Sequence, residues 1–351
     1  MLNPFIHWVE AKGEWAPWLF VAMFLVSSLL MIWRLEAMSA AGFEGTVLGT
    51  LVMPYCSGMG NLIFAFILGR HGGNGADVMT NSLVNNVTNM TLVLGVPAII
   101  WGINVVPKKK PDSKPAKPAK TGGNIGQLNR LSLLLTLLAV VYFSGVVWAL
   151  GSDIKTRGDG RIGFNQGLVL VGMFLFWQCF HVFEVLKQSE RQGHSPMGWM
   201  FPVDMALLAV GAYGIYVSTG WLINWLAHFP KHGFISMDNL GWLSGLLMVL
   251  PNALLALYYG IRRQPETVYA SQVGDAHVSI PLCVGIFALC NRDNPMPMPP
   301  FFQTSMIILL AATFVHLFCV AIFGRLPRLA GVVLVVAYIY FFCNGLLGLG
   351  P

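Results

Sequence analysis

Charged residues are scarce in this chain. Only 10% of its 351 residues are Asp, Glu, Lys or Arg, whereas soluble globular proteins have about 25%. Hydrophobic residues make up 56% of the sequence, and the mean hydropathy is +0.66. These values exclude a soluble enzyme, a disordered protein and a nucleic-acid-binding protein with a basic face. They predict an all-α integral membrane protein.

The chain also lacks the cysteine spacings that hold metals or disulfides. None of its six cysteines stands in a CxxC pair, and all lie in or beside apolar stretches, so we interpret them as packing residues. There is no phosphate-binding loop, no His/Cys cluster and no nucleophile arrangement. The sequence therefore predicts a protein that is not an enzyme and has no organic cofactor and no nucleic-acid partner.

Apolar runs predict ten transmembrane helices. A hydrocarbon core about 30 Å thick requires roughly 20 apolar residues per helix. The first run has neither a basic leader nor a cleavage site, so we expect it to be retained. The predicted spans are 16–34, 45–70, 77–106, 130–151, 162–186, 199–227, 239–262, 266–291, 300–323 and 327–349.

Positive charges predict the orientation of these spans. With the N-terminus outside, 14 of the 21 Lys and Arg residues fall in inside connections, which favours an N-out/C-out topology. The connection 107–129 is rich in Lys and Pro and is interpreted as a cytoplasmic linker that could contact anionic membrane lipids. A second cytoplasmic linker is predicted at 187–198.

Polar residues inside apolar helices reveal an internal repeat. The third span carries Asn81, Asn85 and Asn89 at intervals of four residues, which places them along one side of a helix. The eighth span carries Ser271, Asp275 and Ser279 at the same spacing, each 190 residues later (271 − 81 = 190). Two polar stripes in matching register favour a binding site over helix-joining hydrogen bonds.

The repeat unit has five helices, so its second copy must enter the membrane from the opposite side. The first repeat comprises 1–106 (helices 1–3) and 130–186 (helices 4–5), and the second comprises 199–351 (helices 6–10). Two inverted five-helix repeats are typical of secondary transporters, whose substrate site lies at the midplane between the halves.

The two motif segments, about 57–96 and about 248–286, resemble the α-repeats of the cation/calcium exchanger superfamily. The first includes Gly60-Asn61 and the run Asn81-Ser82-Leu83-Val84-Asn85-Asn86-Val87-Thr88-Asn89. The second includes Pro251-Asn252 and Ser271-Gln272-Val273-Gly274-Asp275-Ala276-His277-Val278-Ser279. The resemblance implies a cation antiporter in which helices 2, 3, 7 and 8 form the site.

This sequence departs from the family at the charged positions. The resemblance places a glutamate of each repeat at positions that are Asn61 and Asn252 here, so Asp275 is the one carboxylate left at the predicted centre. Ca²⁺ prefers about six to eight oxygen ligands and high ligand charge. A single carboxylate therefore predicts a weakened Ca²⁺ site and favours Na⁺ or H⁺.

The predicted cation site combines one charged ligand with neutral oxygen ligands. Asp275, Asn61 and Asn252 are the predicted ligands for Na⁺ or weakly bound Ca²⁺. The full predicted set is Asp275, Asn61, Asn252, Asn85, Asn89, Ser279, Ser57 and Ser271. Asn81 and Ser271 could instead brace the helix packing.

Two histidines inside predicted spans lie outside the polar stripes. His181 and Glu184 lie three residues apart near the inner end of the fifth span and could form a proton-exchanging pair. His316 stands alone in the ninth span, which favours a hydrogen bond between helices.

The sequence thus predicts a secondary active cation antiporter in a bacterial inner membrane. Its predicted partners are membrane lipids and the monovalent or divalent cations that it transports. The alternative from another class is an exchanger-like scaffold that has lost transport and serves as a subunit with partner proteins. Loss of both glutamates motivates this alternative.

Overall fold

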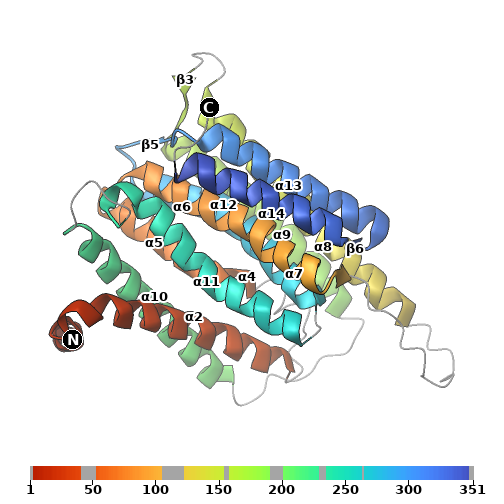
Figure 1. Ribbon diagram of the computed structural model, residues 1–351, viewed down its shortest axis with the longest axis horizontal. Helices are drawn as coiled ribbons and strands as arrows, with labels where there is room; N and C mark the ends of the chain where they lie inside the picture. Colours follow the sequence, from red (N-terminus) through yellow and green to blue (C-terminus); the bar gives the residue numbers. More distant parts are fainter. Residues whose placement is uncertain are drawn as a thin grey trace.

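The computed structural model describes residues 3–40, 53–104, 122–153, 158–189, 201–228, 235–262 and 265–347. The predicted linkers 107–129 and 187–198 lie largely outside these residues. The described chain is a bundle of long helices with three two-stranded sheets at its ends (Figure 1). The fold is therefore all-α, as predicted.

The first half of the chain forms the elements that correspond to predicted spans one to five. They are α1 (Asn3–Glu10), η1 (Gly13–Trp15), α2 (Ala16–Ala40), α4 (Met53–Ser57), α5 (Met59–Arg70), α6 (Gly75–Thr88), η3 (Asn89–Val93), α7 (Leu94–Ile100), β1 (Ile103–Asn104), α8 (Gly122–Gly151), β2 (Ser152–Asp153), β3 (Gly158–Asp159), β4 (Arg161–Ile162) and α9 (Phe164–Ser189).

The second half supplies spans six to ten. Its elements are α10 (Phe201–Leu226), η4 (Met237–Asn239), α11 (Leu240–Ile261), α12 (Pro265–Cys290), β5 (Met296–Pro297), α13 (Phe302–Phe323), β6 (Arg325–Leu326) and α14 (Arg328–Gly345).

The described part of each predicted span is largely helical, but the described residues contain eight helices long and apolar enough to cross a membrane. Two further apolar helices, Met59–Arg70 and Phe164–Phe180, are shorter. The count of ten spans and the N-out/C-out orientation therefore remain predictions.

Three features of the structure differ from the sequence-based expectation. The span predicted at 45–70 is interrupted at Gly58, between α4 and α5. Helix α8 begins at Gly122, so the end of the predicted linker is helical. The three short sheets were not predicted, because two-residue strands carry no alternating hydrophobic pattern.

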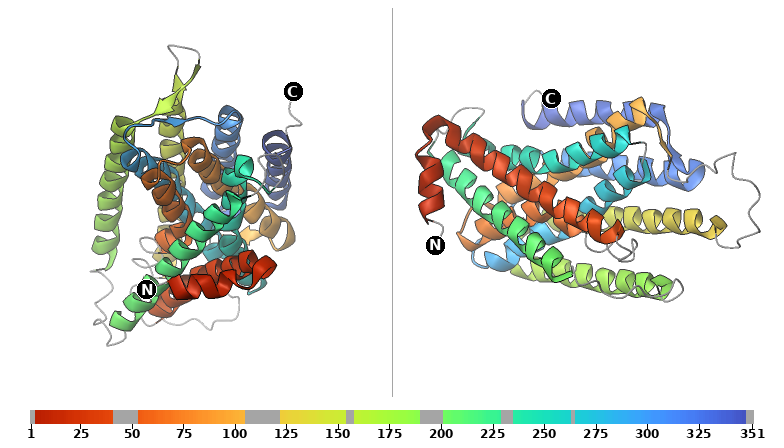
Figure 2. Two further views of the ribbon diagram at one scale, coloured as in Figure 1. Left: turned by 90° about the vertical axis from the view of Figure 1, so that its left-hand side faces the viewer. Right: turned by 90° about the horizontal axis from the view of Figure 1, so that it is seen from below.

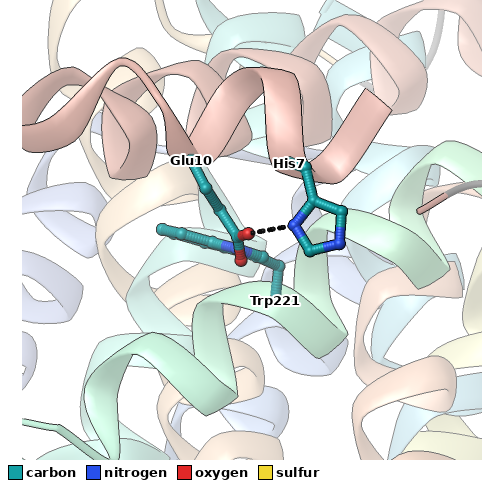
Figure 3. A network of polar contacts seen from close by, with 3 residues as sticks. All are labelled: His7, Glu10 and Trp221. Carbon is teal, nitrogen blue, oxygen red and sulfur yellow. Dashed lines mark hydrogen bonds and ion pairs between the residues drawn. The ribbon is translucent and has the colours of Figure 1, made fainter. Parts of the chain in front are cut away.

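Helices α2 and α10 pack side by side and antiparallel along one edge of the bundle (Figure 1). At one end, Trp221 Nε1 of α10 donates to a carboxylate oxygen of Glu10 at 3.0 Å, and His7 contacts the other oxygen (Figure 3). At the opposite end, Arg34 of α2 forms a part-buried ion pair with Asp204 of α10. Arg34 thus joins α2 to α10 directly, whereas Glu10 and His7 belong to α1 and hold the other end of α10.

The contacts of the two halves repeat with the halves exchanged. Helix α5 of the first half packs on α12 of the second, and α11 of the second half packs on α6 of the first. Likewise α9 packs on α12 while α14 packs on α7, which places α9 and α14 on opposite sides of the bundle (Figure 2). This exchange is the arrangement expected of two structurally related repeats.

The short sheets follow the same rule. Strand β1, after the first motif helix, pairs antiparallel with β6, between the last two helices of the second half. Strand β5, after the second motif helix, pairs antiparallel with β4, between the last two helices of the first half. These two sheets therefore tie one repeat to the other, whereas the third, β2 with β3, is a hairpin within the first half.

Glycines permit the two equivalent helix crossings. A Cβ on Gly95 of α7 would lie 3.0 Å from the carbonyl oxygen of Gly331 in α14. A Cβ on Gly285 of α12 would lie 3.3 Å from the carbonyl oxygen of Gly167 in α9. Gly95 and Gly285 stand at the motif offset (285 − 95 = 190). Small residues at both crossings let the backbones approach closely.

The two motif helices are the most buried spans. Buried residues make up 78% of the most apolar stretch in both Gly75–Ile100 and Val268–Cys290, against 17% in Arg328–Gly345. A polar stripe on either motif helix is therefore enclosed by protein and is not exposed to lipid.

Gly167 and Gly172 of α9 provide a matched test of the crossing. A Cβ at Gly167 would lie 2.6 Å from the Cβ of Ala288, whereas a Cβ at Gly172 meets nothing within 4 Å. We expect Gly167→Ala to destabilise the protein by about 1–3 kcal/mol through overpacking. Gly172→Ala should leave stability unchanged or raise it by up to about 1 kcal/mol. Thermal unfolding of the purified protein in detergent measures both, and equal effects would contradict the crossing.

Candidate cation site

Each of the four central helical segments contains a break, a π turn or an internal proline. The chain breaks at Gly58 between α4 and α5, and α6 passes through the π turn η3 into α7. Pro251 lies inside α11 and Pro281 inside α12, and each removes a backbone donor from its helix. Broken helices at such a position expose backbone and polar side chains to a shared site.

Asp275 is the centre of the polar residues at these interruptions. Its carboxylate oxygen Oδ2 accepts from Nδ2 of Asn85 at 2.9 Å, of Asn89 at 2.8 Å and of Asn252 at 3.1 Å. All four side chains are fully buried. The structure therefore brings together four of the predicted site residues, from α6, the π turn, α11 and α12.

Asn85 and Asp275 occupy equivalent positions of the two repeats and contact each other directly (275 − 85 = 190). Because these two side chains face each other, their charges must be compatible. Two carboxylates at this distance would repel each other. An amide in one repeat and a carboxylate in the other replace this repulsion with a charge-assisted hydrogen bond.

The Oδ1 atoms of Asp275 and of its three amide partners, Asn85, Asn89 and Asn252, have no hydrogen-bond partner among the described residues. The same is true of Oδ1 of Asn61 in α5. A buried polar atom without a partner costs about 1–3 kcal/mol. Several oxygen atoms gathered around one carboxylate are the kind of ligands that a hard cation binds. Rotation of an amide would turn its oxygen toward such an ion.

Asn61 differs from the other amides because neither its oxygen nor its nitrogen has a partner among the described residues. It is fully buried near the start of α5, just after the break at Gly58, and α5 packs against α12. It stands at the position that the sequence comparison assigned to a glutamate. Its unsatisfied amide makes it the clearest candidate for a neutral ligand on the first repeat.

Two of the three predicted serine ligands donate to other groups. Ser279 Oγ donates to Asn86 Oδ1 at 2.8 Å, and Ser271 Oγ donates to the Val268 carbonyl at 3.0 Å. Ser57 is buried at the end of α4. The bond from Ser271 to Val268 lies within α12, so the roles of Ser271 as a ligand and as a brace between helices both stay predictions.

Asn81 also braces helices. Its Nδ2 donates to Ser244 Oγ at 3.0 Å and approaches Met248 Sδ at 3.3 Å, so it joins α6 to α11. The predicted pair of His181 and Glu184 lies within α9, but the side chains of both fall outside the described part of the chain.

Two buried amides were missed by the sequence analysis. Gln272 Nε2 donates to the Asn252 carbonyl at 3.3 Å and to Ser271 Oγ at 3.2 Å. Asn86 accepts from Ser279 and donates to the Ser82 carbonyl at 2.7 Å. Both stand inside apolar spans next to a stripe residue, a signal that could have identified them. Neither residue lies on the four-residue spacing that defines the two polar stripes.

The site carries a single negative charge. Asp275 is the carboxylate in this cluster, and no three His, Cys, Asp or Glu side chains within the described ranges converge to hold a metal. Among the described residues, soft or transition metals therefore have no ligand set here. One carboxylate with amide oxygens is a hard ligand set.

A cavity of about 430 Å³ lies between α2, α5, α10 and α11. Its walls are mainly apolar, with Trp18, Leu222 and Leu243 among them, and Glu14 contributes a carboxylate. Ser244 and Met248 also line the cavity, and both contact Asn81. The cavity therefore reaches the polar stripe of α6.

The unsatisfied amide of Asn61 predicts a trade between stability and binding. Because Leu has a similar shape and no polar atom, we expect Asn61→Leu to stabilise the ion-free protein by about 1–3 kcal/mol. Asn86 is the matched control, since its amide is hydrogen-bonded at both ends. Asn86→Leu should destabilise the protein by a similar amount. Thermal unfolding in sodium-free buffer measures both, and destabilisation by Asn61→Leu would refute this view of the site.

Comparison with solved structures identifies the fold. The chain aligns with the sodium-calcium exchanger NCX_Mj soaked with 2.5 mM Na⁺ and 10 mM Sr²⁺, with a TM-score of 0.62 and 16% identity. This alignment covers 93% of this chain and 96% of that chain. The same exchanger soaked with zero Na⁺ and Ca²⁺ gives a TM-score of 0.61 and 18% identity, covering 93% and 97%.

A comparison with curated protein sequences gives no significant match. The model of the sodium/calcium exchanger protein family matches residues 15–183 and 203–344, which are the two halves described above. These segments make up most of the sequence. The chain therefore belongs to the sodium/calcium exchanger protein family.

Proposed function

We propose that this protein is a secondary active cation antiporter that works by alternating access. The observation that carries the proposal is the buried carboxylate of Asp275, surrounded by amides from both repeats at the interruptions of the central helices. Family membership supports transport over the alternative of an inactive scaffold subunit. Membrane-complex partner proteins would then be additional to the transport role.

The charge of the site determines which ion it can hold. Asp275 with one bound Na⁺ is neutral, and so is Asp275 with one proton. Ca²⁺ at the same place would leave a net positive charge in a poorly polarisable interior, which is costly. We therefore propose Na⁺ or H⁺ coupling and a weakened Ca²⁺ site. Asn61, Asn85, Asn89 and Asn252 would supply neutral oxygen ligands.

The cavity beside α11 gives the proposed path to the site. It is lined by η1, α2 and the end of α10 as well as by Ser244 and Met248. In the proposed topology of ten spans with both termini outside, this cavity opens toward the outer side. The proposed location is a bacterial inner membrane, with lipids around the exposed faces of α9, α10 and α14.

Flux into proteoliposomes tests the function directly. Wild-type protein and Asp275→Asn are reconstituted at equal density, and Na⁺, Ca²⁺ and proton gradients are imposed in turn. We expect cation uptake by the wild type and at least about a hundredfold loss in the variant, because the neutral amide cannot balance the charge of the ion. The gradient that drives uptake identifies the coupling ion.

The control for this experiment is Asp204→Asn, which alters an ion pair between α2 and α10 away from the Asp275 cluster. Both variants are checked for folding by size-exclusion chromatography. Absence of flux from well-folded wild-type protein under every gradient would refute the antiporter and favour the scaffold subunit.

A second carboxylate should restore divalent-ion binding. Asn252 lies 3.1 Å from Asp275, so Asn252→Asp places two carboxylates on one ion. Ca²⁺ affinity rises with ligand charge, and we expect a gain of at least about tenfold for Ca²⁺ relative to Na⁺. Isothermal titration with both ions measures the ratio. Asn81→Asp is the matched control because Asn81 binds Ser244 instead, and an equal gain there would contradict the assignment of Asn252.

A further inference from the structure

His316 of α13 forms two hydrogen bonds inside the bundle. Its Nδ1 lies 2.6 Å from the hydroxyl of Tyr269 in α12, and its Nε2 lies 2.7 Å from the carbonyl oxygen of Met90. His316 and Tyr269 are fully buried. The imidazole therefore bridges both motif helices from a third helix.

The partners fix the role of each imidazole nitrogen. A carbonyl oxygen can only accept, so Nε2 carries a hydrogen and donates to Met90. In the neutral imidazole Nδ1 is then an acceptor, and the Tyr269 hydroxyl donates to it. The residue between the two helices must therefore offer one hydrogen-bond donor and one acceptor, as the two imidazole nitrogens do.

Met90 belongs to the π turn that begins at Asn89, and Asn89 donates to Asp275 at 2.8 Å. Tyr269 lies on the same helix as Asp275. The contacts thus form a closed circuit from Asp275 through Asn89, Met90, His316 and Tyr269 back to α12. The geometry of the Asn89–Asp275 hydrogen bond depends on where this circuit holds the π turn.

The π turn Asn89–Val93 contains neither Pro nor Gly. Pro97 of α7 follows it and cannot donate to the Val93 carbonyl four residues earlier, which favours an irregular turn there. In the second repeat, Pro281 stands at the equivalent register (281 − 91 = 190), inside a helix that continues through it. Contacts from other helices also hold the π turn. His316 on one side and the Tyr338–Thr88 hydrogen bond on the other supply them.

We propose that His316 is a positioning residue for the cation site. By holding the Met90 carbonyl and the Tyr269 hydroxyl, it sets the π turn in which Asn89 reaches Asp275. It therefore controls the affinity for the cation without contacting the ion. This inference rests on the proposed function, since it assigns a role in the affinity of that same site.

The test compares His316→Gln with His316→Leu. A Gln side chain offers a donor and an acceptor at nearly the same separation as the imidazole, whereas Leu offers neither. In proteoliposomes we expect His316→Leu to raise the KM for the coupling cation about tenfold. His316→Gln should keep KM within about threefold of wild type. Tyr269→Phe removes one of the two hydrogen bonds with little change in size, and an increase of about threefold is expected.

A double-mutant cycle separates positioning from general stability. If His316 acts through Asn89, His316→Leu should add less than about twofold to the KM of Asn89→Ala. Independent, multiplicative effects would overturn the proposal. Equal KM values for well-folded Leu, Gln and wild-type proteins would also overturn it. Should His316→Leu fail to fold, Tyr269→Phe with and without Asn89→Ala completes the same cycle.

An infrared measurement keeps this inference separate from the proposed function. The carboxyl band of Asp275 is identified by subtracting the spectrum of Asp275→Asn. We expect this band to shift in His316→Leu and to stay at the wild-type frequency in His316→Gln, because only Leu releases the Asn89 hydrogen bond. The result does not depend on transport. An unshifted band in His316→Leu overturns the positioning role, whereas absent wild-type flux with a shifted band refutes only the antiporter.

Discussion

One buried carboxylate governs the centre of this protein. Asp275 is fully enclosed, and its charge is balanced within the described residues by three amide donors and by no basic side chain. A charge in an apolar interior is tolerated only where hydrogen bonds converge on it. The donors come from α6, the π turn and α11, so three segments must approach α12 closely.

The two repeats are alike in architecture and unlike in chemistry. Helix packing, strand pairing and glycine contacts are exchanged between the halves almost element for element. At the centre, however, the equivalent positions hold Asn85 and Asp275, and the first repeat has a π turn where the second has Pro281 inside a continuous helix. Symmetry therefore builds the frame, and departures from symmetry at a few residues set the charge and the shape of the site.

The sequence predicted the centre of the site because a helical spacing and a constant offset identify which residues share a face. Asn85, Asn89 and Asp275 were predicted on this basis and Asn252 from the resemblance to the exchanger motif, and the structure joins all four. Ser271 and Ser279 share the same stripe but point to other partners, since the direction of a side chain depends on how two helices cross. The position of His316 inside an apolar span predicted a hydrogen bond between helices, which is confirmed. The sequence did not predict its partners or the π turn, because both depend on contacts between distant segments.

The single carboxylate has a consequence for energetics. In the proposed antiport, Asp275 is neutralised by one monovalent cation or one proton, so the loaded protein crosses between its two states without carrying net charge at the site. An exchange of one such ion for another moves no charge across the membrane. The membrane voltage then has nothing to act on in a one-for-one exchange. Such a carrier would be driven by concentration ratios alone, and it would continue to work across a depolarised membrane.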